Sequence, residues 1–526
     1  MTGKNEKVEA ELTIDNNEVV KAVNEKPKGR LFNAAEMKNI AFYIGGIMCF
    51  KFAYETLSNS ISLIAQERFP KGALTLASTL TSTFNVMQIL FSIAGAQLLI
   101  HYNTNKILAF SMFCFGALAL VLIILEAATG GYIGAADKWV PGTWAPELLF
   151  ALYLPMGGCL GVVELVRRVI PRDIVGEDPI KLMKMDASVH IFYEIAGTAG
   201  AFSSTATIKK LGPVYALFVI PVFFTAAGIT WLFIKITTNY DKLKLEDIDG
   251  IKVSRTGGIR KVFTTYFYSI KRGFIIITSE RRFIWLIPGY VLPLMFHRYI
   301  EGYLFPTFSK QVLKEGHLSG FLLAASNFGE LCGALLVLVI GSRIYSPLPW
   351  VRLDSMTLMV LWVFPYLRVT SSLGSIKWVG AVFPLMMVLS AGWAAGDVSL
   401  VAYVQSRLHS VNAANEEGTS PLGCVMALLY SSYVLGYLAL SIPMGKLFDK
   451  YKADGNIIRA FFWGSGILIV IGAVIIFSST FIPKGAFALN PKVDGVAALK
   501  MDQRAIADEV EHRNGQSSIN RASINE

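Results

Sequence analysis

The sequence predicts an all-α membrane protein of twelve transmembrane helices, arranged as two pseudo-symmetric six-helix bundles. Hydrophobic residues make up 53% of the 526 residues and charged residues only 16%, which is typical of a chain that crosses a bilayer several times. Apolar stretches of about twenty residues, the length that crosses roughly 30 Å of hydrocarbon as a helix, recur along most of the chain. A similar set of polar residues recurs in both halves, which indicates an internal duplication.

The predicted spans divide into six before and six after a long charged segment. The first 39 residues contain no apolar stretch that could serve as a signal peptide, so we expect the first span to direct its own insertion. We expect cytosolic polar tails at residues 1–39 and 484–526, six-helix bundles at 40–236 and 283–483, and a basic cytosolic linker at 237–282. The predicted spans, of which the ninth is the shortest, are residues 40–66, 74–100, 106–128, 146–168, 186–208, 213–236, 283–308, 318–341, 353–368, 377–405, 421–444 and 457–482.

The net charge of +10 does not indicate a nucleic-acid partner, because the basic residues favour alternate loops. The linker and the loop between spans 4 and 5 are rich in Lys and Arg, which places both of them and both termini in the cytosol. The loop between spans 11 and 12, with Lys446, Lys450 and Lys452, departs from this bias. The plasma membrane and the vacuolar membrane stay open as alternatives, and the sequence gives no oligomeric state.

The second part of the linker has the pattern of an amphipathic helix. Between residues 260 and 278, apolar residues such as Phe263, Phe267 and Phe274 recur at helical spacing beside Lys271 and Arg272. This pattern is typical of a helix that lies on the inner leaflet of a membrane. The alternative is a solvated connector that carries some aromatic residues.

Polar residues inside the spans carry the functional prediction. Span 1 contains Lys51 and Glu55, and span 7 contains His297 and Glu301, each pair a base and an acid one helical turn apart. Placing such a group at the centre of a bilayer costs about 2 to 3 kcal/mol, so these groups usually face a cavity where they have a function. We expect these four residues to bind substrate or couple protons at matching places in the two halves. The alternative is an ion pair on a helix surface near one end of each span.

A second polar pair also recurs, as Asn85 with Gln88 in span 2 and Asn327 with Glu330 in span 8. A spacing of three places each pair on one face of its helix. Amide groups in this position could bind a substrate, or they could hold one helix to another. Glu330 is the strongest candidate of the four, because a carboxylate has the highest free-energy cost in purely apolar surroundings.

Further candidates for coupling or gating lie in spans 4, 5, 7 and 10. Glu164 is near Arg167 and Arg168, so an interfacial cluster is its alternative role. We place Arg352 and Asp354 in the loop between spans 8 and 9, where gating or solvated roles are expected. The candidates in these four spans are Glu164, Glu194 with His190 one turn before it, Arg298 and Asp397.

The sequence predicts no enzyme, no cofactor and no metal site. A Gly-rich phosphate loop followed by Lys is missing from the sequence, which argues against an ATP-driven pump. The cysteines lie inside apolar stretches, where an unpaired thiol behaves as a small hydrophobe, and they lack the spacing of a zinc site. They are Cys49, Cys114, Cys159, Cys332 and Cys424.

The twelve spans, the central basic linker and the repeated polar pairs together resemble the major facilitator superfamily of transporters. The family's motif after span 2, Gly-x-Leu-x-Asp-Arg, is degenerate at Gly95, but a better copy follows span 11 as Gly445-Lys446-Leu447-Phe448-Asp449-Lys450. The stretches Arg168–Gly176, Met185–Gly197 and Gly392–Leu400 are similar to fungal members described as general transporters. The resemblance implies a central cavity between two bundles.

These observations predict a secondary active transporter that moves a small polar or zwitterionic organic solute by alternating access, with protons as the coupling ion. The expected partners are the lipid bilayer, a small-molecule substrate and protons. Two alternatives remain: a transporter-like sensor or scaffold without net flux, and a facilitator without ion coupling. Neither the direction of transport nor the substrate follows from the sequence.

Overall fold

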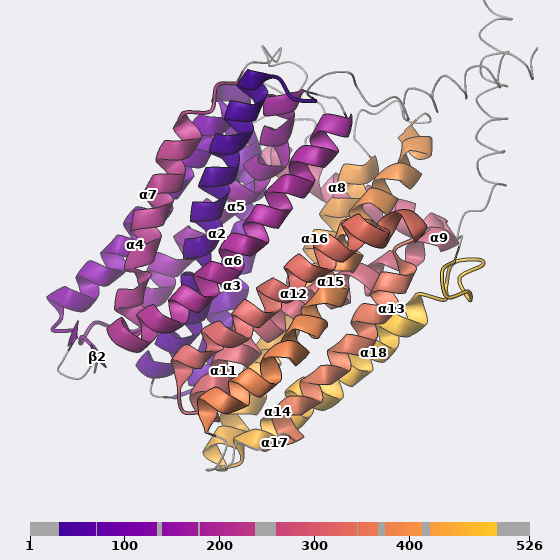
Figure 1. Ribbon diagram of the computed structural model, residues 1–526. Helices are drawn as coiled ribbons and strands as arrows, with labels where there is room; N and C mark the ends of the chain where they lie inside the picture. The colour runs from indigo at the N-terminus through magenta and orange to yellow at the C-terminus, as the bar shows by residue number, and fades with distance from the viewer. Residues whose placement is uncertain are drawn as a thin grey trace, which may run out of the picture.

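The computed structural model describes residues 31–69, 71–133, 139–176, 179–236, 259–344, 346–366, 374–412 and 421–491. These residues are mostly helical (Figure 1). Ten helical segments in the described part of the chain are long and apolar enough to cross a membrane. They are Ala34–Arg68, Ala73–Gly95, Thr104–Ala128, Leu148–Val175, Lys184–Leu232, Arg281–Gln311, Gly316–Ile340, Ser375–Leu400, Gly423–Ala453 and Ile457–Ser479.

The first half of the chain forms a series of long helices joined by short connections. The first helix of the described residues begins at Ala34 because Asn33 caps it. Asn33 Oδ1 accepts from the Glu36 amide at 2.8 Å, and Glu36 Oε2 accepts from the Asn33 amide at 2.8 Å. The elements are α2 Ala34–Arg68, α3 Ala73–His101, α4 Thr104–Ala128, α5 Leu148–Val175, α6 Pro179–Tyr215, η2 Ala216–Phe218 and α7 Val219–Leu232.

The single apolar segment Lys184–Leu232 contains predicted span 186–208 and most of predicted span 213–236. Gly212 separates them, because it has a left-handed φ of 75° and is followed by Pro213. A short antiparallel hairpin of β1 Tyr132–Ile133 and β2 Trp139–Val140 lies between α4 and α5. The all-α prediction did not include this hairpin.

The second half is more interrupted than the first. The region of predicted span 7 contains two π-helical segments, η4 Ile287–Val291 and η5 Ile300–Leu304. The remaining elements are α8 Ile259–Ser279, α9 Arg281–Ile284, α10 Leu292–Tyr299, α11 Phe305–Gln311, η6 Gly316–Leu318, α12 Ser319–Ile340, η7 Gly341–Arg343, α13 Leu348–Thr357, η8 Leu358–Trp362, α14 Val363–Tyr366, α15 Ser375–Asn412, α16 Pro421–Ala453, α17 Ile457–Phe461, η9 Phe462–Ile467 and α18 Leu468–Ser479.

The region of predicted span 9 begins earlier than the sequence suggested. Arg352 and Asp354, which we placed in a loop, lie in α13 and are buried. Arg352 is tied to the end of the chain's last described segment, since its Nη1 donates to the Ala488 carbonyl at 2.7 Å and its Nε to Thr480 Oγ1 at 3.0 Å. The prediction of a loop is therefore wrong. These charged side chains are buried because they bind partners that are distant in the sequence, and the local sequence does not show such partners.

Among the described residues, buried hydrophobic side chains form two large clusters and a small one of Leu63, Ile208 and Ala216. One runs from Ile40 to Ile234, and the other is made almost wholly of residues from Ile277 to Ala486. Figure 1 shows α2 to α7 gathered on one side of the molecule and α11 to α18 on the other. We call the end of the molecule where α2 ends and α3 begins the α2–α3 end; β2, α11 and α17 lie at the same end (Figure 1).

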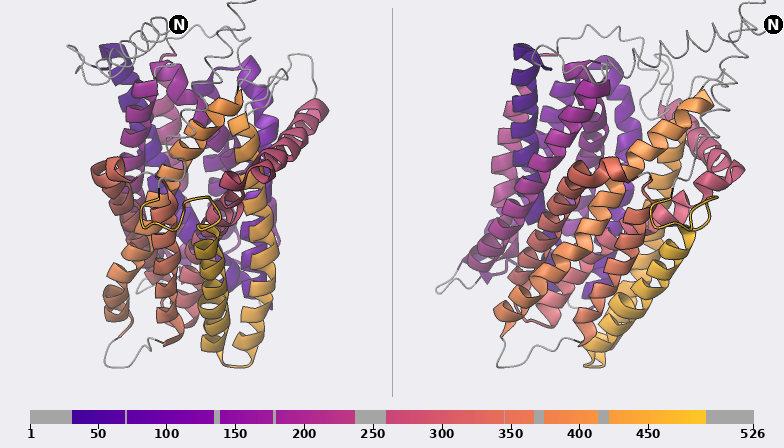
Figure 2. Two further views of the ribbon diagram at one scale, coloured as in Figure 1. Left: turned by 90° about the vertical axis from the view of Figure 1, so that its right-hand side faces the viewer. Right: turned by 45° about the vertical axis from the view of Figure 1, so that its right-hand side comes forward.

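Helix α8 covers the range where the sequence predicted an amphipathic helix. It runs at a slant to the long helices (Figure 2, left) and packs on α16, where Tyr266 Oη lies 2.8 Å from Ser431 Oγ. Phe267, Tyr268 and Phe274 are exposed on this helix. That it lies on the inner leaflet stays a prediction.

Candidate functional site: a buried polar cluster between the two halves

The first predicted pair lies on α2 in the interior of the protein. Lys51 and Glu55 form an ion pair, and both residues are at most 5% exposed. Lys51 Nζ also donates to Asn327 Oδ1 of α12 at 3.3 Å and lies 4.7 Å from the ring centre of Tyr193 on α6. Lys51 thus joins groups from both halves of the chain.

Glycine at position 197 makes this meeting possible. A Cβ atom on Gly197 would lie 2.6 Å from Lys51 Cε and 3.3 Å from the side-chain carbon of Asn327. A larger residue would therefore force the end of the Lys51 side chain to shift. Gly197 thus allows the close approach of α6, α2 and α12.

One turn before Gly197, Glu194 is 1% exposed and interacts electrostatically with Glu330 of α12. Its Oε2 atom has no hydrogen-bond partner among the described residues. Ionised carboxylates are acceptors only, so a hydrogen bond between these two groups requires a proton on one of them. The pair bridges a helix of the first half and a helix of the second.

The second predicted pair is arranged differently from the first. His297 Nε2 lies 2.9 Å from Asp354 Oδ1 of α13, and both side chains are 2% exposed. Glu301 instead accepts from Ser326 Oγ at 2.6 Å and lies 3.4 Å from Arg298 Nη1. Arg298 is permanently charged whereas histidine is charged only when protonated, so Arg298 is the stronger partner for Glu301. The expectation that His297 pairs with Glu301 is wrong.

Six ionisable side chains thus form one polar cluster across α2, α6, α10, η5 and α12. Mutual electrostatic interactions connect them, and half of the Arg298 side-chain surface is exposed although the other members are buried or half-buried. Four members are carboxylates and two are cations, so a fully ionised cluster would carry excess negative charge. We call this set the central cluster: Lys51, Glu55, Glu194, Arg298, Glu301 and Glu330.

The predicted site residues of α3 and α5 lie outside the central cluster. Asn85 is half-buried on α3, one turn before Gln88. Gln88 and Glu164 line a small pocket between α3, α5, α8 and α16, and Glu164 Oε1 lies 2.6 Å from Arg167 Nη1. The ion pair agrees with the alternative role that the sequence left open for Glu164.

Asp397 lines a second, smaller pocket in the second half. Asp354, Tyr290 and Trp393 also line this pocket, and Trp393 stacks on His297 with ring centres 5.2 Å apart. Asp397 interacts electrostatically with His190 of α6. The sequence analysis named Asp354 but placed it in a loop and did not connect it with His297; Pro349, at the first turn of α13, was the available sign that a helix begins there.

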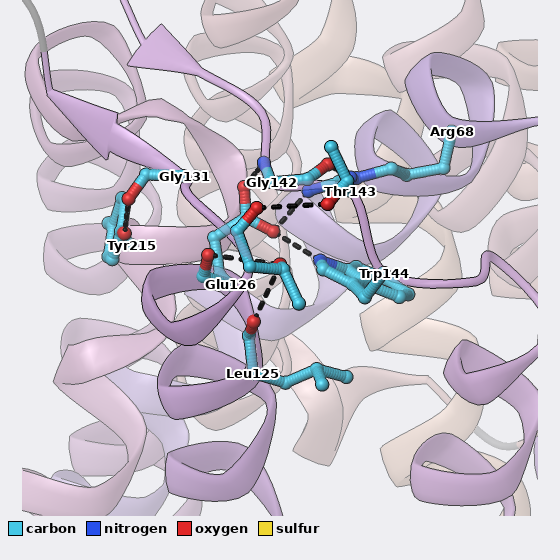
Figure 3. Close-up of polar contacts among 9 residues, drawn as sticks. Arg68, Leu125, Glu126, Gly131, Gly142, Thr143, Trp144 and Tyr215 are labelled. Carbon is cyan, nitrogen blue, oxygen red and sulfur yellow. Dashed lines mark hydrogen bonds and ion pairs between the residues drawn. The ribbon is translucent and has the colours of Figure 1, made fainter.

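A further buried network, missed in the sequence, lies at the α2–α3 end. Glu126 of α4 accepts from Arg68, from Trp144 Nε1 and, at 2.9 Å, from the Gly142 amide (Figure 3). Glu126 has no exposed surface. Because its partners come from α2 and from the segment that joins β2 to α5, this network fixes the hairpin segment on the first half of the chain.

Within the described residues, no group of three or more His, Cys, Asp or Glu side chains could hold a metal ion. No family model and no curated protein matches the sequence.

Solved structures share the fold at low sequence identity. The nucleoside transporter NupG matches with a TM-score of 0.54 and 12% identity over 86% of this chain and 100% of that chain. The xylose transporter XylE from E. coli, in a partially occluded inward-open conformation, matches with a TM-score of 0.57 and 12% identity over 86% and 98%. A peptide transporter POT in complex with alafosfalin matches with a TM-score of 0.53 and 13% identity over 84% and 94%. The protein therefore shares its fold with these three transporters.

Proposed function

We propose that the protein is a secondary active transporter that moves a small polar or zwitterionic organic solute by alternating access, coupled to protons. The central cluster carries the proposal. It brings four carboxylates and two cations from both halves of the chain together, and of these only the Arg298 side chain is half-exposed. Ionisable groups at such depth are costly, and transporters use them as substrate and proton sites.

The membrane arrangement is part of the proposal. Twelve spans follow if Lys184–Leu232 contains two of them and the helical stretch from α13 to α14 is a further one. The two core clusters support two bundles, at residues 40–236 and 283–483. The basic linker and basic loops favour a cytosolic position for both termini. The α2–α3 end would then face away from the cytosol.

Glu194 and Glu330 are the proposed proton site. Two carboxylates close together in a low-dielectric interior repel when both are ionised, so a shared proton stabilises them. Each carboxylate comes from a different half, so gain or loss of the proton changes the attraction between the halves. This is the coupling that alternating access requires.

Arg298 is the proposed substrate anchor, because its guanidinium is half-exposed while charged and aromatic groups surround it. A guanidinium binds a carboxylate of a substrate well, and the excess of carboxylates in the central cluster suits an amino group. The fold neighbours are by name transporters of nucleosides, xylose and peptides, which are all small polar solutes.

The test is uptake by proteoliposomes with an inside-alkaline pH gradient, screened with amino acids, dipeptides, nucleosides and sugars. We expect one class to accumulate, an ionophore that collapses the gradient to abolish accumulation, and Glu330→Gln to abolish it as well. Glu315→Gln, at a partly exposed carboxylate in the connection before α12, is the matched control and should transport normally.

Other outcomes favour the alternatives. Uptake that persists with the ionophore and in Glu330→Gln would indicate an uncoupled facilitator. A solute that raises the thermal unfolding temperature but never accumulates would indicate a sensor or scaffold.

A further inference from the structure

The motif Gly445-Lys446-Leu447-Phe448-Asp449-Lys450 lies near the end of α16 and contacts the start of α3, at the α2–α3 end. Asp449 accepts three hydrogen bonds from α3: from the Leu74 amide at 3.1 Å, the Thr75 amide at 2.8 Å and Thr75 Oγ1 at 2.6 Å. The first amides of a helix have no partner within it and carry partial positive charge. A carboxylate from the second half of the chain therefore caps a helix of the first half.

The sequence of α3 explains why it needs a cap from elsewhere. The residue before this helix is Gly72, which has no side chain to accept from the first turn and adopts a left-handed φ of 64°. The same conformation brings Gly72 within reach of Asp449: an added Cβ would lie 3.8 Å from Asp449 Oδ2.

Close packing extends the contact along both helices. A Cβ atom on Gly445 would lie 2.6 Å from Thr75 Cα and 2.5 Å from Ser78 Oγ, so only glycine fits there. One turn deeper, Ser82 Oγ and Ser441 Oγ are 2.5 Å apart and both residues are fully buried. Asp449 thus sits at the mouth of a tight seam between α3 and α16.

A second set of polar contacts joins the halves at the same end. Lys310 Nζ of α11 lies 2.7 Å from Glu67 Oε1 of α2, and Gln311 Nε2 donates to Gln66 Oε1 at 2.9 Å. The α2–α3 end is therefore closed in this structure by contacts between residues far apart in the chain. Asp449 differs from the others because it alone of these groups accepts from backbone amides, which a side-chain rotation cannot replace.

We propose that Asp449 is the latch that holds the two halves together at the α2–α3 end, and that this end opens when the carboxylate leaves the start of α3. The inference rests on the proposed function, since alternating access requires this end to open. In the open state the α3 amides and the Asp449 carboxylate are hydrated separately. The latch therefore sets the ratio of the two states without touching the substrate.

The first experiment measures opening without any substrate. A single reporter, Ser78→Cys, is placed in a cysteine-free background, and its rate of reaction with a membrane-impermeant maleimide is measured with and without Asp449→Ala. Ser78 is fully buried in the closed seam. We expect the rate to rise about tenfold, as loss of a charge-assisted hydrogen bond implies, and to rise less in Asp449→Asn. Asp454→Asn, at an exposed carboxylate in the following turn, is the matched control and should leave the rate unchanged.

A second measurement guards against variants that fold poorly. Ser82→Cys and Ser441→Cys are combined, a protease site is inserted between residues 237 and 258, and the cleaved halves are separated on a non-reducing gel. Oxidation should join the halves efficiently with Asp449 present and less efficiently in Asp449→Ala. Unchanged labelling and unchanged cross-linking in folded Asp449→Ala would overturn the latch. Failure of the transport proposal would appear as absent uptake in the wild type, which neither measurement involves.

Discussion

Removal of Lys51 alone should destabilise the protein far more than removal of Lys51 together with Glu55. In Lys51→Met the Glu55 carboxylate, which is 2% exposed, stays buried without its cation. Breaking a buried pair in this way costs about 3 to 5 kcal/mol. At roughly 2 to 4 °C per kcal/mol for larger domains, the midpoint of thermal unfolding should fall by about 10 °C.

The double variant Lys51→Met with Glu55→Leu removes both charges and retains most of the volume. Replacement of a buried ion pair by apolar residues often leaves the free energy of unfolding unchanged. The double variant should therefore lose only about 1 kcal/mol of that free energy, for the hydrogen bond that Lys51 donates to Asn327. The measurement is thermal unfolding of the purified protein in detergent, with Arg282→Met as control. Arg282 pairs with Glu280 on the surface, where such pairs contribute roughly 0 to 1 kcal/mol. A double variant as unstable as Lys51→Met would refute the argument, as would a single variant no less stable than the control.

Three further outcomes follow from other contacts. Arg68→Ala should lower stability by about 3 to 5 kcal/mol in the same assay, because it leaves the fully buried Glu126 without its cation, and stability equal to that of the wild type would contradict this account. His297→Phe retains a ring against Trp393 but leaves Asp354 without its hydrogen-bond partner, so it should lower the free energy of unfolding by about 1 to 3 kcal/mol. His297→Gln can still donate a hydrogen bond to Asp354, so it should lower the free energy of unfolding by less. A solute that raises the thermal unfolding temperature of the wild type should not raise that of Arg298→Met. Equal stabilisation of the variant and the wild type would contradict this prediction.

The sequence predicted best what depends on neighbours along one helix. Lys51 and Glu55 pair as expected because a spacing of four places them on one face of α2, and the apolar stretches correspond to helices because length and composition determine both. The second pair shows the limit of this reasoning. His297 and Glu301 have the same spacing, yet His297 pairs with Asp354 and Glu301 contacts Ser326 and Arg298. Arg298 lies on the same helical stretch as Glu301, but Asp354 and Ser326 come from α13 and α12. How those two helices pack against it is information that one sequence does not contain.

The same limit explains why the motif on α16 gave no function from sequence alone. Its position after predicted span 11 departs from the family pattern, so the resemblance assigned it no role. In the structure its glycine and its aspartate serve one contact, since Gly445 permits the approach of α3 and Asp449 caps the helix that approaches. Each residue is needed for the other: without glycine the carboxylate could not reach the Thr75 amide, and without the carboxylate the approach would bury an unsatisfied helix start. A variant with Gly445→Ala should therefore raise labelling of the Ser78→Cys reporter as Asp449→Ala does, and equal protection of the reporter in Gly445→Ala and the wild type would show that the two residues act independently.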